Sequence, residues 1–266
     1  MEIVFNKVNY KIFNKTVLER TVLNDINIRI EGNKITAFLG TSGSGKSSLV
    51  QLIKGIINPT SGTISIKKGK LLNNEIGLLF QNNDDQFIGN TLREELNLYG
   101  VQCDEKQIES VLKELDLSIE YLDKDLSKMG SGELRKVALA SIFIIDFKVI
   151  ILDEPSIGLQ SKSKKKLIKY LKRLKYKFDK TIIVVSHDSD FVYELADFVH
   201  VLDKGNIVYS GLKNKLFKDT NLLVKYGLEI PKLIEMVDII NKRKNVDLGY
   251  RNDINDLVKD IYRYAR

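Results

Sequence analysis

Residues 40–48 read GTSGSGKSS, and this stretch decides the fold. It matches the pattern G-x-x-x-x-G-K-[ST], whose fixed positions are Gly40, Gly45, Lys46 and Ser47. Glycines let backbone N–H groups approach phosphate oxygens, and the N-terminus of a following helix favours the same anion. We therefore predict a phosphate-binding loop rather than a chance turn rich in glycine and serine. The residues expected to contact a nucleotide are Gly40, Thr41, Ser42, Gly43, Ser44, Gly45, Lys46, Ser47 and Ser48.

The sequence on both sides of this loop supports the prediction. ITAFLG (35–40) is an apolar stretch typical of a strand, and SSLVQLIKGI (47–56) has apolar residues at helical spacing. A strand before the loop and a helix after it are what the motif requires. In such a loop Lys46 neutralises the β- and γ-phosphates, and the hydroxyl of Ser47 ligates Mg²⁺.

A second motif is VIILDEP, residues 149–155. Its continuous apolar run is typical of a strand buried on both faces of a parallel sheet. That strand would deliver Asp153 and Glu154 to its carboxyl end, where nucleotide chemistry takes place in such sheets. We expect Asp153 to hold Mg²⁺, directly or through water, and Glu154 to polarise the attacking water. A strand that ends in Asp-Glu is common, so the assignment depends on the phosphate loop about 100 residues earlier.

Two further polar residues follow predicted strands. His187, in SHD (186–188), is expected to hydrogen-bond a γ-phosphate oxygen, whereas His200, inside FVHVL, is interpreted as structural. Gln81 follows EIGLLF (75–80) and is expected to contact Mg²⁺ or the attacking water. The sequence therefore assigns catalytic roles to Glu154, His187 and Gln81, and metal contacts to Ser47, Gln81 and Asp153.

The remaining pattern is that of a three-layer α/β protein. Strands are expected at GTISI (62–66) and TIIVVSH (181–187), with a lysine-rich helix at about 161–177. FVHVLDKGNIVYS (198–210) reads as a hairpin. From about residue 212 the sequence pattern is helical and differs in character from the repetition of strands and helices that precedes it. We therefore expect a nucleotide-binding domain over residues 1–211 and a C-terminal helical segment over residues 212–266.

Composition excludes several other classes of protein. The single cysteine, Cys103, rules out an internal disulfide, and no apolar stretch approaches the roughly 20 residues of a membrane span. The N-terminus shows no signal-peptide core. The net charge of +7 is compatible with nucleic acid or an anionic membrane, but the lysines are scattered. We attribute the charge to a compositional bias of the genome and expect no nucleic-acid partner.

Residues 128–136, KMGSGELRK, present two readings: a loop that caps a helix, or a phosphate-binding loop that has lost part of its chemistry. The order of phosphate loop, glutamine, this loop, Asp-Glu strand and histidine resembles that of ATP-binding-cassette (ABC) ATPases. The resemblance implies a P-loop NTPase core with an antiparallel β subdomain, a helical subdomain and a small C-terminal helical domain. It also implies that KMGSGELRK is the signature loop, which contacts the ATP held by a partner subunit. The contacting residues would be Gly130, Ser131, Gly132 and Glu133.

Three other stretches resemble the ATPases of energy-coupling factor (ECF) transporters. They are FQNNDDQF (80–87), with Asn83 where that family has proline, TVLERTVLNDI (16–26), and LFKDTNLLVKYGLEIPKL (216–233). The second is similar to an insertion in the second of the two ATPase paralogues of that family. The family also places an aromatic ring against adenine near the end of the first strand. Ile12 occupies that position here, flanked by Tyr10 and Phe13, and Phe13 is the residue we favour.

This resemblance implies an importer in which ATP hydrolysis, with Mg²⁺, drives the uptake of a vitamin or a metal ion. The implied partners are a second ATPase subunit, with a heterodimer favoured over a homodimer, a transmembrane coupling subunit and a substrate-capturing membrane subunit. The implied location is the cytoplasmic face of the cell membrane. A soluble non-transport ABC ATPase and a nucleotide-dependent regulator are the alternatives. The first usually carries long coiled-coil insertions or a duplicated cassette, and the second would lack Lys46, Glu154 or His187.

The sequence departs from the family at two places that serve the partner's ATP. Gly130 stands where the signature has serine, and Gln160 stands where the family usually has aspartate. We therefore expect the two ATP sites of a heterodimer to be unequal. Residues 84–100 are expected to contact the coupling subunit through Phe87, Ile88 and Leu92. Residues 212–266 are expected to support dimerisation.

Overall fold

The structure is a computed structural model that describes residues 1–82, 85–101, 104–244, 246, 248–249 and 254–264. Asn83 and Cys103 lie outside the described residues. The strands are β1 (Glu2–Ile12), β2 (Arg20–Glu31), β3 (Ile35–Leu39), β4 (Ser61–Lys67), β5 (Ile76–Leu79), β6 (Val149–Asp153), β7 (Thr181–Val185), β8 (Phe198–Asp203) and β9 (Asn206–Leu212). The α-helices are α1 (Lys46–Lys54), α2 (Leu92–Leu98), α3 (Glu105–Glu114), α4 (Ser131–Ile144), α5 (Ser161–Phe178), α6 (Ser189–Leu195), α7 (Lys213–Lys218), α8 (Thr220–Lys225), α9 (Lys232–Lys244) and α10 (Ile254–Tyr264).

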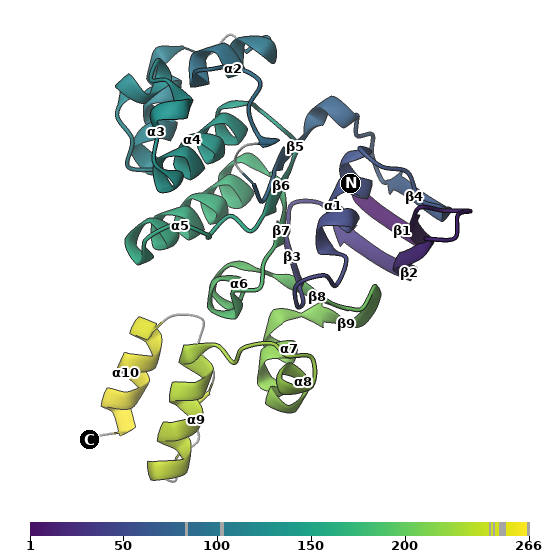
Figure 1. The fold of residues 1–266 in the computed structure, drawn as a ribbon. Helices are drawn as coiled ribbons and strands as arrows, with labels where there is room; N and C mark the ends of the chain where they lie inside the picture. The colour runs from purple at the N-terminus through teal and green to yellow at the C-terminus, as the bar shows by residue number, and fades with distance from the viewer. Residues whose placement is uncertain (83–84, 102–103, 245, 247, 250–253, 265–266) are drawn as a thin grey trace.

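The central sheet has six strands in the order β5-β6-β7-β3-β8-β9. The first five are parallel, and β9 pairs antiparallel with β8 as the expected hairpin. β3, β6 and β7 are buried along their whole length, which explains their continuous apolar sequences. Because parallel strands share one carboxyl edge, the loops that follow β3, β5, β6 and β7 meet at the same edge of the sheet (Figure 1).

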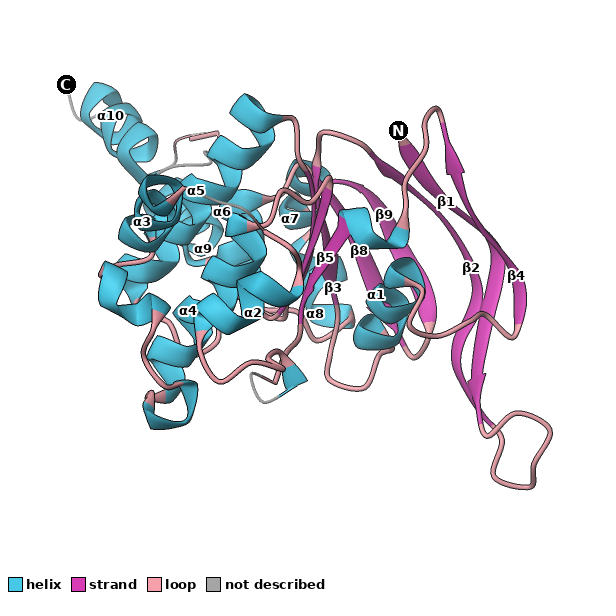
Figure 2. Ribbon diagram, turned by 90° about the horizontal axis from the view of Figure 1, so that it is seen from above, coloured by secondary structure: helices cyan, strands magenta, loops and turns pink. Residues whose placement is uncertain are grey.

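A second, antiparallel sheet has the order β2-β1-β4. Alternate residues of β2, namely Ile26, Ile28 and Ile30, are buried on one face. This apolar face packs with Leu49 and Ile53 of α1, which lies between the two sheets (Figure 2). The alternating apolar residues of DINIRIE (25–31) account for this half-buried strand. The expected P-loop NTPase fold with an antiparallel subdomain is confirmed.

The helical subdomain covers the opposite face of the central sheet. Leu92 and Leu96 of α2 and Leu112 of α3 join α4, α5 and the sheet in one hydrophobic cluster. Leu92 is fully buried and Phe87 packs partly against this cluster, whereas Ile88 is 85% exposed. The expectation that Leu92 contacts another subunit is therefore wrong, because its side chain packs within the helical subdomain.

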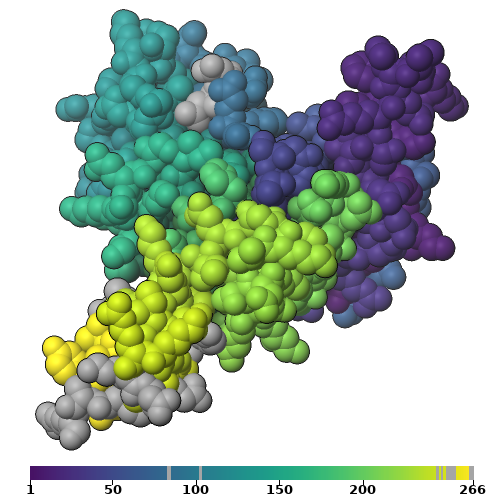
Figure 3. Space-filling view, turned by 60° about the horizontal axis from the view of Figure 1, so that its bottom comes forward, coloured from purple at the N-terminus to yellow at the C-terminus, as the bar shows by residue number. Residues whose placement is uncertain are grey.

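The chain after β9 has two parts that pack differently. α7 and α8 contribute Leu216, Phe217 and Leu223 to a cluster that also contains Ala37 and Leu39 of β3. In α9 and α10, Val237 and Leu257 form a small cluster of their own together with Leu248. These last helices extend from the body of the molecule (Figure 3). The packing is therefore continuous across residue 212, and the domain boundary expected there stays a prediction.

The segment from the end of α8 to the first residue of α9, residues 226–232, lies against the phosphate loop and the first turn of α6. Gly227 has a left-handed backbone with φ of 63°, and a Cβ added to it would lie 3.3 Å from Cγ2 of Thr41 in the phosphate loop. At the other end, the backbone N–H of Lys232 donates a 2.8 Å hydrogen bond to Asp190, in the first turn of α6. We refer to residues 226–232 as the strap.

No helix in the described part of the chain combines the length and the apolar character needed to cross a membrane.

Candidate nucleotide-binding and hydrolysis site

The phosphate loop depends on glycine at two places where a side chain would not fit. At Gly40 an added Cβ would lie 2.2 Å from the carbonyl oxygen of Leu202. At Gly45, φ is 106° and an added Cβ would lie 2.8 Å from Cδ2 of Leu23. The loop is thus packed closely against β8 and β2, and only glycine allows that approach.

Lys46 begins α1, and its ammonium group lies inside the loop. Nζ donates hydrogen bonds of 2.8 Å to the carbonyl oxygens of Gly40 and Thr41. The residue is only 8% exposed. Burial lowers its pKa, although the nearby Glu154 and Asp153 oppose that shift. The loop therefore holds a positive charge at its centre, beside two carboxylates.

The metal contacts expected from the sequence line one pocket. This pocket, of about 420 Å³, is formed by Ser47, Gln51, Phe80, Gln81, Asn82, Asp85 and Asp153. The hydroxyl side chain of Ser47 lies close to the carboxylate of Asp153. Burial raises the pKa of Asp153, while Ser47, Lys46 and Arg135 favour its charged form and Glu154 disfavours it.

One atom in this pocket lacks a partner. Oδ1 of Asp153 is buried and has no hydrogen bond within the described part of the chain. A buried carboxylate oxygen is costly to leave unsatisfied. Together with a hydroxyl and a side-chain amide, it forms the all-oxygen set of ligands that Mg²⁺ prefers. The residues present therefore fit a magnesium ion.

Glu154 is held from several sides at the end of β6. Its carboxylate is buried, with Oε2 accepting a 3.2 Å hydrogen bond from Ser186 and Oε1 lying 2.8 Å from Nδ1 of His187. Its backbone N–H donates to the carbonyl oxygen of Val185 at 2.9 Å. Its φ of 50° lies in the left-handed region, which non-glycine residues seldom adopt. The carboxylate orientation is therefore fixed by the end of β7.

The structure adds one residue that sequence reasoning missed. Arg135 of α4 is 2% exposed, and its guanidinium donates to the carbonyl oxygens of Phe80, Asp153 and Glu154. The available signal was a charged residue just before the apolar run VALASIFII, on a helix that had to be buried. Such a charge requires internal partners.

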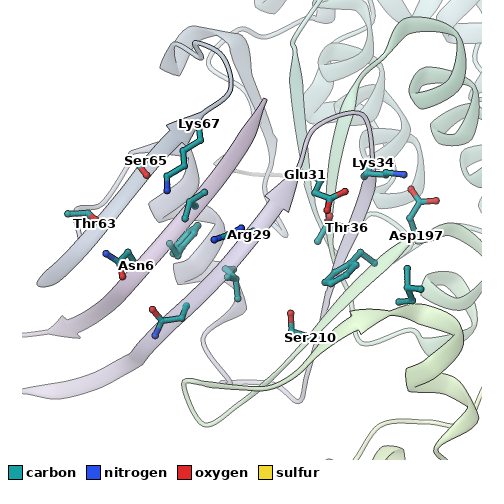
Figure 4. Close-up of a pocket in the computed structure, with 16 residues that line it drawn as sticks. Asn6, Arg29, Glu31, Lys34, Thr36, Thr63, Ser65, Lys67, Asp197 and Ser210 are labelled. Carbon is teal, nitrogen blue, oxygen red and sulfur yellow. The ribbon is translucent and has the colours of Figure 1, made fainter.

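A pocket of larger volume lies elsewhere. It has a volume of about 930 Å³ and lies between the antiparallel sheet and the strands β3, β8 and β9 (Figure 4). Arg29, Thr63, Lys67, Asp197 and Ser210 are among its lining residues. None of the nucleotide-site residues predicted from the sequence lines it, so size alone does not identify the chemical centre of this protein.

Comparison with known proteins is consistent with this site. The family model described as ABC transporter matches residues 23–157. The energy-coupling factor transporter ATP-binding protein EcfA2 of Spiroplasma kunkelii is 33% identical over 284 residues, which cover 99% of this chain and 93% of that protein. EcfA2 of Clostridium perfringens is 32% identical and covers 92% of each chain.

The chain belongs to the ATP-binding subunits of energy-coupling factor transporters. It is therefore an ATPase that binds ATP and whose hydrolysis reaction is coupled to transport. The expected family, fold and activity are confirmed.

Solved structures agree with this assignment. The structure of cbiO1 from Clostridium perfringens, described as part of the ABC transporter complex cbiONQ, is 26% identical to this ECF ATPase subunit. It covers 89% of this chain and 98% of its own, with a TM-score of 0.69. A dimeric ATP-binding cassette with bound ADP and Pi, at 23% identity and a TM-score of 0.70, covers 79% of this chain and 98% of its own, and it supports the fold.

In this ECF ATPase subunit, the stretch predicted to be the signature loop begins α4. The backbone N–H of Gly130 donates a 3.1 Å hydrogen bond to Glu133, closing the first turn of the helix. Glu133 also contacts the hydroxyl of Tyr121 and lies 3.4 Å from Nζ of Lys124. The Tyr121 hydroxyl lowers the pKa of Glu133 most, followed by the Gly130 N–H. The carboxylate of Glu133 is thus engaged within its own subunit, whereas Ser131 is exposed.

Two groups of predicted contacts lie outside the pocket around Ser47 and Asp153. Gly130, Ser131, Gly132 and Glu133 do not line it, which is compatible with a role toward another subunit's ATP. Phe13 does not line it either: the side chain is 63% exposed at the turn between β1 and β2, with φ of 51°. Contact between Phe13 and adenine stays a prediction.

Proposed function

We propose that this chain binds Mg·ATP at its phosphate loop and hydrolyses it with Glu154 as the residue that polarises the attacking water. The observation that carries the proposal is the fixed, buried carboxylate of Glu154, next to Asp153 and within reach of the charge of Lys46. A general base in a fixed position typically contributes 10²–10⁴-fold to a reaction rate. Lys46 would neutralise phosphate charge, and the loop N–H groups would bind phosphate oxygens.

Ser47, Gln81 and Asp153 would hold the magnesium ion. When bound, Mg²⁺ would neutralise charge on the β- and γ-phosphates during phosphoryl transfer. Gln81 is exposed at the end of β5, so its side chain can reach the same pocket from a second strand. His187 is in hydrogen-bonding distance of Glu154 through Nδ1, which leaves its other ring nitrogen for a γ-phosphate oxygen.

The assembly proposed from the family is a heterodimer with a second ECF ATPase subunit. It would associate peripherally with the cytoplasmic face of the membrane through a transmembrane coupling subunit. A substrate-capturing membrane subunit would select the cargo, a vitamin or a metal ion. The names of the EcfA2 relatives and of the cbiONQ component support this assembly.

Two exposed apolar surfaces suit such partners. Ile88, 85% exposed, lies just after the Gln81 loop and is proposed to contact the coupling subunit. On the C-terminal helices, Met236, Ile239, Val258 and Tyr262 are between 40% and 72% exposed. These four residues are proposed to form part of the contact between the two ATPase subunits, since α9 and α10 have little core of their own.

We also propose that the two ATP sites of the heterodimer turn over unequally. Gly130 supplies no hydroxyl to the partner's ATP, and Glu133 is engaged with Tyr121 and Lys124. Only the exposed Ser131 offers a signature hydroxyl, from a position one residue later. The ATP bound by this chain's own Lys46 faces the partner's signature loop and would be hydrolysed faster.

The test uses the complex reconstituted with both ATPase subunits and the coupling subunit. When the partner ATPase carries a glutamine in place of its own catalytic glutamate, Glu154→Gln should lower ATP hydrolysis by about 10²-fold or more while ATP binding persists. Lys46→Ala should instead weaken ATP binding. Glu114→Gln is the matched control, because Glu114 pairs with Arg173 on α3 and α5, away from the site. Full ATPase activity in the Glu154→Gln complex would refute the assignment.

A further inference from the structure

We propose that Arg135, on the helix that begins with the signature loop, positions Glu154 and Gln81 for hydrolysis of the ATP bound by this chain. The proposal rests on the role proposed above for Glu154. Arg135 would touch neither nucleotide nor water, so it is a positioning residue.

The contacts of Arg135 form a fork between three backbone carbonyl groups. Nη1 donates to the oxygen of Phe80 at 2.7 Å, and Nη2 donates to the oxygens of Asp153 and Glu154 at 2.6 and 2.7 Å. Burial lowers the pKa of Arg135 to about 10, which leaves the guanidinium charged at neutral pH. The planar guanidinium presents donors in several fixed directions, whereas a lysine ammonium is a single point.

The three carbonyl groups lie just beyond the point where the pairing between β5 and β6 ends. β5 and β6 pair in parallel as far as Leu79 and Leu152. Phe80 and Glu154 are the first residues after β5 and β6, in the loops that carry Gln81 and the catalytic carboxylate, and Asp153 is the last residue of β6, paired with Val185 of β7. Arg135 thus extends the connection between these two strands beyond their last register pair.

Glu154 needs such support because its backbone is in an unfavourable region. A non-glycine residue with φ of 50° keeps that conformation only when its surroundings impose it. On one side, the N–H of Glu154 is bound to Val185 of β7. On the other side, its carbonyl oxygen is bound to Arg135 of α4. Removal of the α4 contact would free the peptide that orients the carboxylate.

The location of Arg135 also connects the two ATP sites. Ser131, the first residue of α4, lies four positions earlier and therefore one helical turn away on the same face. The signature end of α4 is proposed to face the partner's ATP, while Arg135 contacts the catalytic loop of this chain's own site. One helical turn of α4 thus connects Ser131, proposed to face the partner's ATP, with Arg135, which positions the residues that act on this chain's own ATP.

The test compares Arg135→Gln and Arg135→Lys in a complex whose partner ATPase carries a glutamine in place of its own catalytic glutamate. Only the site of this chain then turns over. We expect Arg135→Gln to lower kcat about 100-fold with KM for ATP within about threefold, because a misplacement near 1 Å costs on that order. The kcat of Arg135→Lys should lie between those of wild type and Arg135→Gln, because lysine keeps the positive charge but not the several donors in fixed directions. Lys175→Met, which removes a buried cation paired with Asp197 away from the site, should lower the melting temperature and leave kcat unchanged.

Two results would overturn the proposal. One is a lowered melting temperature with unchanged kcat in both Arg135 variants, which is the behaviour of a purely structural residue. The other is a raised KM with unchanged kcat, which would assign Arg135 to nucleotide binding. If Arg135→Gln does not assemble, Arg135→Lys decides between these outcomes alone. A complex in which Glu154→Gln retains full activity would instead refute the proposed function.

Discussion

His200 should make the folded protein sensitive to mild acid. Its ring is fully buried in β8, stacked on the ring of Phe38 at 5.0 Å and tilted against that of Phe198 at 5.2 Å. Neither ring nitrogen has a hydrogen-bond partner within the described part of the chain. Burial lowers the pKa of His200 from 6.5 to about 4. The interpretation of this residue as structural agrees with that environment.

The sign and size of the effect follow from this pKa difference. Between pH 6.5 and about pH 4 the unfolded chain binds a proton at His200 and the folded chain does not. Acid therefore stabilises the unfolded state, and the free energy of unfolding falls as the pH decreases through this window. From about pH 7.5 to about pH 4.5, His200 alone should remove about 2.5 kcal/mol.

The assay is urea unfolding of the isolated chain at both pH values, for wild type and for His200→Phe. The variant should lose about 2.5 kcal/mol less than wild type on acidification. Carboxylates that titrate in the same range are common to both proteins and cancel in this comparison. His200→Leu should give the same difference, since any packing cost of a substitution is present at both pH values. Parallel pH profiles of the wild type and the two variants would refute the argument.

Three further predictions concern the interfaces and the strap. Gly130→Ser fits without a clash, because an added Cβ comes only within 3.8 Å of Glu133. It should raise hydrolysis of the partner's ATP by about tenfold. The measurement uses a complex in which Glu154→Gln has stopped hydrolysis at this chain's own site. An unchanged rate would contradict the proposal that the two ATP sites turn over unequally. Ile88→Glu should prevent assembly with the coupling subunit without destabilising the isolated chain, whereas the half-exposed Ile56, substituted in the same way, should not affect assembly. Gly227→Ala should cost about 1–2 kcal/mol in urea unfolding because of its positive φ, and the loss should persist when Thr41→Ser removes the methyl group beside it.

The sequence predicts those parts of the fold whose determinants are local. The apolar runs at 149–152 and 181–185 are visible as buried strands, and the phosphate loop identifies the strand and helix on either side. Ser47, Gln81 and Asp153 could be grouped in advance, because parallel strands deliver their carboxyl ends to one edge. Their shared pocket follows from topology rather than from detailed packing.

The remaining features depend on contacts between distant positions. Arg135 is separated by 55 residues from Phe80 and by 19 from Glu154, and no local pattern indicates that a helix supplies donors to both. Leu92 was assigned to an interface because it is apolar and near a loop, but burial depends on how α2 packs on α4. The left-handed backbone of Glu154 likewise has no compositional signal, since glutamate does not favour it.

The strap has a consequence for how the C-terminal helices can be exchanged between related ATPases. Residues 226–232 contact Thr41 of the phosphate loop at one end and Asp190 of α6 at the other. A graft that joins foreign helices after β9 would replace Gly227 and Lys232 but not the two residues that they meet. A functional chimera would therefore need glycine at position 227, where φ is 63°, and any residue but proline at position 232, whose backbone N–H is the donor to Asp190. The natural junction for such a graft lies after Ile234, the residue of α9 that packs in the cluster around β3, and not at the end of the last strand.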